Sequence, residues 1–409
     1  MSRLHPDLAL GLCLRALGLI TINHACLGDY DQPGWFAVKL VTILLGMLLV
    51  FTPQKQSTEF GFDHFKLSAV IAGLLCLAKL YTLLFLRDVL TQSLLLTMYF
   101  LTISCSAKKA KERNSILLCL SILSASTYLL AIVHKLNYDF LYTAQSCAIH
   151  GYDLSLSLIP QFLMSSLHKS QLIHLLNTYP LLASISVLSL EWLLALLCWQ
   201  RHKLIWLIGL IFHLPLTLTI APSFGAVMAL GWGAGTMLGS RNTKYNKRQT
   251  VKLKLILKHK LIVFIYVSHG LLSPYLGIEV QHSAAMLSNL RIDPACANSL
   301  IFPPIGHDPY VYIHKAHFGQ NKRPKRLKKL QAGLWSLSAL KTMQKNWCIK
   351  EQRPLKLKGT YAHQPFEIAD LCAKEALYQL YERSHLPTFG AWQRFQKNLQ
   401  KTCHQSCVH

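Results

Sequence analysis

The sequence predicts an all-α polytopic membrane protein with about nine transmembrane helices and a small α+β C-terminal extramembrane domain. Three observations support this fold class. Of the 409 residues, 52% are apolar and 15% are charged, and the mean hydropathy is +0.30. The apolar residues gather in runs long enough to cross a bilayer. After residue 277 the chain becomes polar and basic, which is typical of a separate domain outside the membrane.

Nine apolar runs are candidate spans, because a span needs about 20 mostly apolar residues. The first run carries Arg15 near its middle and no cleavage pattern of small residues, so we expect a retained helix and not a secretion signal. The sixth run is longer than a span requires and is predicted to tilt. The membrane domain is expected to cover 1–277 and the extramembrane domain 278–409. The nine runs are 8–27, 36–52, 67–86, 89–105, 115–133, 171–199, 204–221, 223–239 and 257–277.

The net charge of +24 indicates basic residues at a membrane surface and not a nucleic-acid-binding site. In membrane proteins, basic residues collect in cytoplasmic loops and beside anionic lipids. The predicted partner is therefore the lipid bilayer, and nucleic acid is not expected to bind. Placing the N-terminus inside makes the loops 53–66, 107–114, 200–203 and 240–256 cytoplasmic, and these hold many basic residues. The expected location is the inner (cell) membrane of a bacterium, with the C-terminal domain on the outer side.

Two shorter segments have their own predictions. Residues Leu154 to Met164 form an apolar piece that is too short to span and is interrupted by Pro160, so a re-entrant or interfacial helix is expected. Residues Gly225 to Gly239 carry small side chains at helical spacing. Such spacing favours close packing of membrane helices over phosphate binding.

The C-terminal domain contains one predicted strand and one predicted amphipathic helix. Residues Tyr310 to Ile313 alternate as a strand does. Apolar residues from Leu327 to Trp347 recur every three or four positions, as in a helix with one apolar face. Basic residues lie alongside, from Lys325 onward. Two placements stay open: the helix lies on lipid headgroups, or it packs within the domain and exposes a solvated face.

The twelve cysteines include no CxxC pair. At the C-terminus, Cys403, His404, Cys407 and His409 are spaced loosely like metal ligands, but no second ligand pair lies nearby, so no metal site is predicted. A mobile tail and a single disulfide both stay open there. Six cysteines lie inside apolar runs, where a thiol acts as a small hydrophobic group: Cys13, Cys26, Cys76, Cys105, Cys119 and Cys198.

Several ionisable residues lie near the middle of predicted spans, where a charge is costly. Glu191 has no counterion close in sequence, so we expect it to be protonated or paired with a base from another helix, such as Arg15 or Lys79. His213 precedes Pro215, which loosens a helix and would let the ring reach a cavity. Structural hydrogen bonding and a functional role stay open for both residues.

The stretch 126–140, STYLLAIVHKLNYDF, is an apolar helix pattern that reaches a water boundary. Lys135 at this boundary is either an anchor whose ammonium extends to water, or a base whose pKa is lowered by the bilayer edge. Asp139 follows one helical turn later and would pair with Lys135 if the helix continued. This stretch is the first candidate for a functional site.

Two short motifs, MLSNLR with Asn289 and Arg291, and ANSLIFP, follow the last predicted span. They resemble the segment after the last span of the horizontally transferred transmembrane (HTTM) family, which shares its membrane fold with vitamin K-dependent γ-glutamyl carboxylase. KLNYDF at 135–140 resembles the family's lysine motif. His213 approximates a family histidine, and Glu191 lies where many members have a span glutamate. The chain departs from the carboxylase in having His134, Asn137 and Phe140 within the lysine motif.

The resemblance implies a quinol-linked carboxylase-like or epoxidase-like enzyme, a lyase of unknown substrate. In the family's chemistry a base deprotonates a hydroquinone, oxygen adds, and the basic oxygen species takes a proton from an unactivated carbon. By this resemblance Lys135, His213 and His134 are catalytic, the cofactor is a reduced vitamin K-like quinone, and the substrate is a protein or peptide. A second function stays open, that of a catalytically silent membrane component that assembles with another protein or helps to export it.

Overall fold

The chain divides into two compact units. Unit 1 comprises Met1–Ile132, Asp153–Met164 and Val187–His269, and unit 2 comprises Val133–Tyr152, Ser165–Ser186 and Gly270–His409. The computed structural model describes residues 6–27, 35–51, 64–84, 91–106, 112–219, 223–239, 255–276, 288–304, 310–317, 330–331, 333–351, 354–373, 375–383, 401, 403–404 and 407. Residues 107–111 and 240–254 of the predicted basic loops, and the basic residues from Lys325 to Lys329, lie outside these residues.

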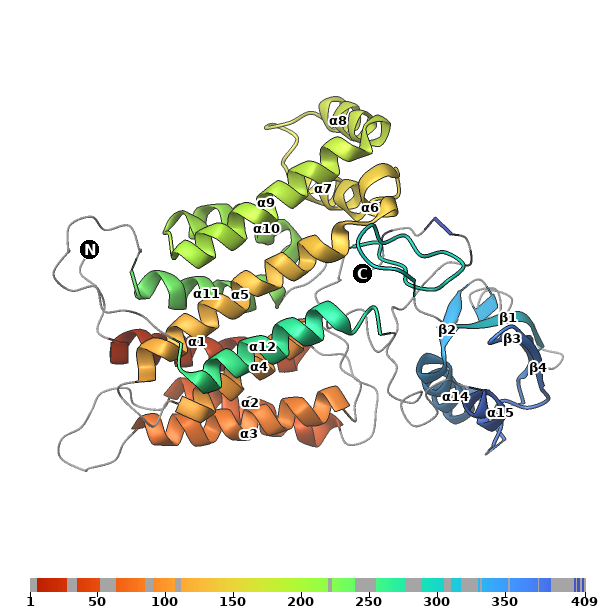
Figure 1. The fold of residues 1–409 in the computed structure, drawn as a ribbon, viewed down its shortest axis with the longest axis horizontal. Helices are drawn as coiled ribbons and strands as arrows, with labels where there is room; N and C mark the ends of the chain where they lie inside the picture. Colours follow the sequence, from red (N-terminus) through yellow and green to blue (C-terminus); the bar gives the residue numbers. More distant parts are fainter. Residues whose placement is uncertain are drawn as a thin grey trace. The chain divides into compact units, whose positions relative to one another are not determined.

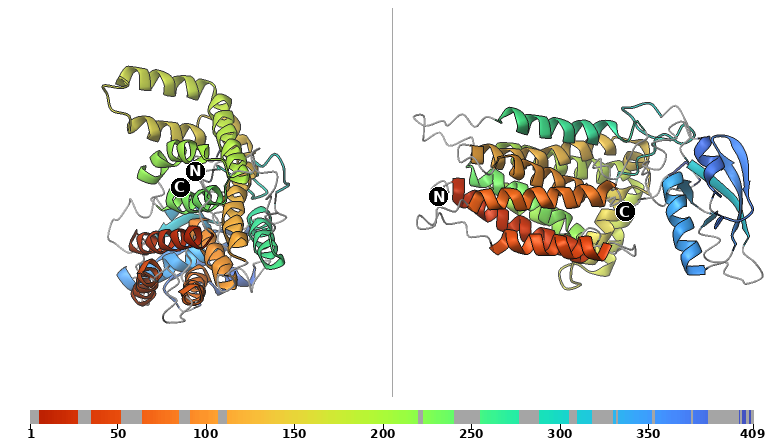
Figure 2. Two further views of the ribbon diagram at one scale, coloured as in Figure 1. Left: turned by 90° about the vertical axis from the view of Figure 1, so that its left-hand side faces the viewer. Right: turned by 90° about the horizontal axis from the view of Figure 1, so that it is seen from below.

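Unit 1 is built of apolar helices, and α1 to α4 lie lengthwise beside one another (Figures 1 and 2). Helices α5 and α9 each continue into unit 2, α5 at its end and α9 at its start. The helix bounds are α1 Pro6–Leu27, α2 Trp35–Phe51, α3 His64–Leu84, α4 Thr91–Ser106, α5 Arg113–Lys135, α9 Pro180–Gln200, α10 Leu204–Thr219, α11 Phe224–Met237 and α12 Leu257–Leu272.

The helices support a membrane protein, although the predicted count of nine spans stays a prediction. Four helices in the described residues are long and apolar enough to cross a bilayer: Asp7–Cys26, Phe65–Thr82, Arg113–Lys135 and Pro180–Gln200. Four shorter apolar helices accompany them. Helix α10 exposes Leu207, Ile211, Leu214 and Leu218 along one face. An apolar stripe of this kind is what a helix presents to acyl chains.

The prediction of one long tilted helix over 171–199 is wrong. Helix α8 covers Ser166–Thr178, Tyr179 is its C-cap in a non-helical conformation, and α9 begins at Pro180. Proline is favoured in the first turn of a helix but disfavours a helical conformation in the residue before it. The single proline therefore divides the apolar run into two helices.

Helix α5 binds several neighbours of unit 1 through hydroxyl groups and close contacts. The Ser124 hydroxyl hydrogen-bonds with the Tyr99 hydroxyl of α4 over 2.5 Å, and Thr127 bonds with Tyr266 of α12 over 2.8 Å. A Cβ added at Gly231 of α11 would overlap the Ser124 hydroxyl. The glycine therefore lets α11 approach α5 closely, which confirms the predicted small-residue packing.

Ion pairs and hydrogen bonds mark the two ends of this bundle. At one end Arg113 pairs with Asp7, and Lys258 Nζ lies 2.6 Å from a Glu112 carboxylate oxygen. At the other end the His24 ring, near the end of α1, bonds to Ser93 near the start of α4. The start of α1 thus meets the start of α5, and its end meets the start of α4, so α4 runs antiparallel to α1.

Unit 2 contains a four-stranded antiparallel sheet in the order β2-β1-β3-β4. Its core includes Val311, Ile313, Leu340 and Leu357, all fully buried. The elements are β1 Tyr310–His317, β2 Leu334–Ser336, α14 Leu337–Glu351, β3 Lys356–Tyr361, β4 Gln364–Ile368 and α15 Tyr378–Glu382, together with α6 Tyr138–Tyr142, the first part of α7 Cys147–Ser157, and α8. The strand predicted at Tyr310 is confirmed.

Two predictions for short elements need correction. Residues Leu334–Ser336 form a strand that interrupts the helix predicted from Leu327: Leu330 and Gln331 are helical, and α14 begins at Leu337. Its apolar face packs into the core of unit 2, while Lys341 and Lys345 are exposed, so it is the packed helix and not the headgroup helix. The stretch predicted as a helix over Leu154–Met164 is helical only to Ser157, and Pro160 lies in the turns that follow.

Candidate functional site

A helix break follows Lys135 in unit 2. Helix α5 ends at Lys135 and α6 begins at Tyr138. The Asn137 side chain hydrogen-bonds to the end of α5 and to the start of α6. Its Nδ2 donates to the His134 carbonyl over 2.8 Å, and its Oδ1 accepts from the Phe140 backbone N–H over 2.9 Å. An asparagine in extended conformation is a favoured N-cap. The continuous helix that would place Asp139 one turn above Lys135 is therefore not formed.

Residues 288–300 pair with this break, although some 150 positions separate them along the chain. The Tyr138 N–H donates to the Asn298 carbonyl over 2.8 Å, and the Leu300 N–H donates to the Leu136 carbonyl over 3.0 Å. Asn137 also donates to the Ser288 carbonyl over 2.5 Å. Because buried backbone groups need partners, this pairing satisfies the break. The structure thus brings together the two motifs that the sequence analysis singled out.

Asn298 is the centre of the buried polar network at this break. Its Nδ2 donates to Asp139 Oδ2 over 2.7 Å and to the Asn289 carbonyl over 2.8 Å. Its Oδ1 accepts from the Arg291 N–H over 2.8 Å. The Arg291 guanidinium donates hydrogen bonds to both carboxylate oxygens of Asp293 over 2.9 Å. The side chains of Arg291 and Asp293 are 1% and 0% exposed. Such a fork satisfies both buried charges.

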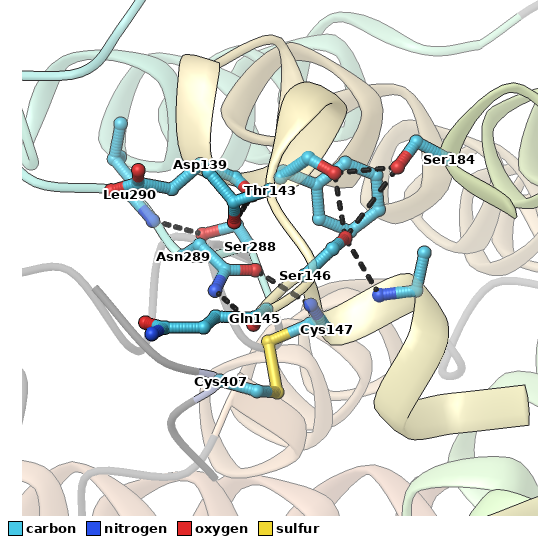
Figure 3. The surroundings of a disulfide bond; sticks show 12 residues. Asp139, Thr143, Gln145, Ser146, Cys147, Ser184, Ser288, Asn289, Leu290 and Cys407 are labelled. Carbon is cyan, nitrogen blue, oxygen red and sulfur yellow. Dashed lines mark hydrogen bonds between the residues drawn. A yellow bond between two sulfur atoms is a disulfide. The ribbon is translucent and has the colours of Figure 1, made fainter. Parts of the chain in front are cut away.

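A disulfide lies beside this network (Figure 3). Asn289 has a left-handed backbone with φ of 57°, a conformation that asparagine tolerates better than most residues. Its Oδ1 accepts from the Cys147 N–H over 2.8 Å, and its Nδ2 donates to the Gln145 carbonyl over 3.1 Å. Cys147 is bonded to Cys407, 260 positions away. Asn289 therefore positions the turn that carries the disulfide.

The C-terminal tail carries two disulfides, whereas the sequence predicted one at most. Cys403 pairs with Cys296, and Cys407 pairs with Cys147. Between them, His404 Nδ1 lies 3.4 Å from Asp139 Oδ1. The described part of the tail is therefore tied to the network around Asp139. Within the described residues, no group of three or more His, Cys, Asp or Glu side chains is placed to hold a metal ion.

The two basic residues at the end of α5 differ in their surroundings. Lys135 is 6% exposed, with its Nζ 5.8 Å from the centre of the Phe140 ring. An anchoring lysine keeps its ammonium in water, which the buried side chain of Lys135 does not do. His134 is fully buried: its Nε2 donates to the Gly270 carbonyl over 2.9 Å, and its Nδ1 lies 3.3 Å from the Tyr275 hydroxyl. His134 thus joins α5 to the segment around α12.

The remaining candidate residues belong to unit 1. His213 is 3% exposed, its Nε2 hydrogen-bonds with the Tyr128 hydroxyl over 2.8 Å, and aromatic rings surround it, including Trp232 at 5.5 Å. Glu191 and Lys79 are 4% and 5% exposed, whereas Arg15 is exposed on α1. The Glu191 carboxyl is therefore surrounded by protein and not by lipid. Its predicted pairing with a specific base stays a prediction.

No family model, curated protein or solved structure matches this chain. The resemblance to the HTTM family therefore stays a prediction that depends on the short motifs. Sequence reasoning missed Asp293, Asn298 and the two cysteines, Cys147 and Cys296, that bind the tail. A signal was available, because three of these four residues lie in RIDPACANS, directly after the motif that contains Asn289.

Proposed function

We propose that the chain is an integral membrane protein whose unit 2 lies on the outer side of the inner (cell) membrane of a bacterium. Its twelve cysteines support this orientation. The six that form disulfides all belong to unit 2, and the six free ones all belong to unit 1. Disulfides persist in oxidising compartments and are rare in the cytosol. The N-terminus is then cytoplasmic, in agreement with the basic loops.

For activity, we propose a quinol-linked enzyme of the carboxylase-like type, with Lys135 as the base. The observation that carries this proposal is the burial of Lys135 at a helix break that is held by the second motif of the HTTM resemblance. A general base must be held close to the group whose proton it takes, and the helix break fixes Lys135 in one place. Asp139 is held by Asn298 and His404 and shapes the same break.

Two exposed aromatic rings near Lys135 support a reduced quinone as the cofactor. The rings of Tyr138 and Tyr142 are half exposed and lie 5.4 Å apart on α6, while the Phe140 ring of the same helix is fully buried beside the lysine amine. Aromatic side chains of this kind stack on planar rings. A bound reduced quinone would supply the reducing electrons and the acidic hydroxyl. The role of Lys135 would be to take that proton, and Phe140 would keep water from the amine.

Substitution of Lys135 by arginine tests the activity. Arginine keeps the positive charge and the long stem but does not lose its proton, so it preserves an anchor and abolishes a base. The measurement is oxygen uptake by the purified protein in liposomes that contain a reduced quinone. We expect Lys135→Arg to lose the uptake at matched protein levels. Lys345→Arg, at an exposed lysine of α14, is the matched control and should keep it.

The competing function is that of a catalytically silent component that assembles with another protein or helps to export it. The satisfied buried network and the disulfide-tied tail favour it, because both would also hold a rigid outer domain in place. Uptake retained by Lys135→Arg, or no uptake by the wild-type protein, would replace the enzyme proposal with this one. In that case unit 2 is the expected binding surface for the other protein.

The orientation has its own test. Reporters fused after residue 250 and after residue 409 should give an inside and an outside signal, respectively. An inside signal from the second fusion would contradict the proposed orientation of unit 2. Free thiols at Cys348 and Cys372 in the native protein would contradict its oxidising compartment.

A further inference from the structure

Helix α8 meets α9 at Tyr179, and the two helices run in different directions there. The Tyr179 N–H donates to the Leu175 carbonyl over 2.9 Å and so ends α8. The Tyr179 carbonyl accepts from the Leu182 N–H over 3.0 Å, in the first turn of α9. In the left-hand view of Figure 2, α8 turns away from the direction of α9. Both α8 and the start of α9 belong to unit 2.

The break at Tyr179 lies on the surface of the protein. The Tyr179 side chain is 59% exposed, and Thr178 before it and Leu181 after it are exposed as well. The ends of a helix leave backbone groups without partners inside that helix, and hydrocarbon offers them none. Where α9 crosses a bilayer, its exposed start therefore lies at the level of the headgroups and not among the acyl chains.

The length of α9 agrees with this level. Tyr179 and Trp199 are 59% and 49% exposed. The rise between them is about 30 Å at 1.5 Å per residue, which is the thickness of the hydrocarbon core. Between them Leu182, Ile185 and Leu196 are exposed at helical spacing and give α9 a face for acyl chains. Because Tyr and Trp are enriched at the two interfaces of a membrane, Tyr179 marks one of them.

Helix α8 has the length and the surface of a helix that lies along an interface. It has 13 residues and no carboxylate that lipid phosphates would repel, and its length of about 20 Å is too short to span. Leu167 and Leu175 are 64% and 44% exposed on one side of α8. The exposed Ser170 and Asn177 lie about 110° around the helix from them. A helix with separate apolar and polar faces lies in the plane of the interface.

We propose that α8 lies along the membrane surface, on the side of the membrane to which unit 2 belongs. Leu167 and Leu175 then lie among the upper parts of the acyl chains, and Ser170 and Asn177 face water. The partner is the phospholipid headgroup layer of that leaflet. The apolar surface of α8 thus continues, through Tyr179, the surface that α9 presents to acyl chains. This inference rests on the proposed membrane location, but it needs neither the proposed activity nor the proposed orientation.

The test is electron paramagnetic resonance of nitroxide labels on the full chain in liposomes. The background variant is Cys26→Ser/Cys105→Ser, which removes the two exposed free thiols. A single exposed cysteine is then introduced and labelled. Molecular oxygen concentrates in hydrocarbon, whereas a nickel chelate stays in water. The ratio of the collision rates of these two reagents with the label therefore reports whether a position lies among acyl chains or in water.

Four positions of α8 are compared. Leu167→Cys and Leu175→Cys place the label on the apolar side, and Ser170→Cys and Asn177→Cys place it on the polar side. We expect the ratio of oxygen collisions to nickel collisions to be several-fold higher at both leucine positions than at both polar positions. All four side chains are exposed, so the substitutions leave the packing of α8 intact.

Two controls separate this inference from the membrane location on which it rests. Ile211→Cys, at a 64% exposed position of α10, should give the high ratio of a lipid-facing site, and Lys345→Cys, on α14, should give the low ratio of water. A low ratio at Ile211 would refute the membrane location. With the expected ratio at Ile211, low ratios at Leu167 and Leu175 would overturn the interfacial helix alone. Labels there that collide with neither reagent would also overturn it, because protein would then cover α8.

Discussion

Removal of the disulfide between Cys348 and Cys372 should lower the stability of unit 2 by a calculable amount. Cys348 lies on α14 and Cys372 follows β4, so the bond joins the helix to the end of the sheet, 24 positions apart. A cross-link stabilises mainly by restricting the unfolded chain, and for a loop of this length the chain-entropy model gives about 3.5 kcal/mol. For a unit of 150 to 250 residues, each kcal/mol shifts the melting temperature by about 2 to 4 °C. The expected decrease is therefore about 7 to 14 °C.

The assay is a thermal melt of the purified full chain in detergent, with protease cleavage as the readout for unit 2. The variant is Cys348→Ser/Cys372→Ser. Its matched control is Cys26→Ser/Cys105→Ser, which changes two exposed free cysteines of unit 1 and should shift the melt of unit 2 by less than about 2 °C. A variant that melts with the wild type, while mass spectrometry shows the bond intact in the wild type, would refute the loop-entropy reasoning.

Three further predictions concern single positions. Gly231→Ala should destabilise unit 1 by about 1 to 3 kcal/mol, because the added Cβ would meet Ser124. Gly233→Ala on the same helix is the control, since its Cβ would meet nothing closer than 3.5 Å. Equal melting temperatures for the two variants would contradict the close packing at Gly231. Glu191→Gln should give more folded protein than Glu191→Leu, because an amide keeps most hydrogen bonds of a buried carboxyl, and equal yields would argue against a polar partner. Hydrogen bonds from Lys356 and Lys358 lower the pKa of Glu367 below 4.5. The ion pairs of Glu367 therefore stabilise unit 2 above about pH 4.5, and this stabilisation is lost as the pH falls through the lowered pKa. The difference in melting temperature between the wild type and Glu367→Gln should then become smaller in acid. A difference that becomes larger in acid would contradict the lowered pKa.

The helical runs and the small-residue packing could be predicted from the sequence because they depend on local patterns. A run of 20 apolar residues has few alternatives to a helix in a bilayer, since each backbone group must find its partner within the segment. Gly225 to Gly239 carried small residues at helical spacing, and the structure uses Gly231 for close approach to α5. The strand at Tyr310 was likewise visible as alternation.

Other features required the tertiary structure because they join distant parts of the chain. Leu334–Ser336 has a helical pattern in sequence, yet pairing with β1 makes it a strand. The break at Tyr179 lies inside an apolar run that hydropathy alone treats as continuous. The cysteines after residue 277 are odd in number, and only the fold shows that Cys147 is the sixth partner.

The sequence by itself determined that this chain is rich in long apolar runs, basic and divided into apolar and polar parts, because these properties are sums over residues. It also marked Lys135 and Asn289 as candidates, through motifs that are local. The tertiary structure decided that Asn137, Asn298 and Asn289 meet at one helix break, and that Cys403 and Cys407 tie the tail to it. Hydrogen bonds and disulfides of this kind depend on distances of a few ångströms between residues more than a hundred positions apart, and no local pattern contains such distances.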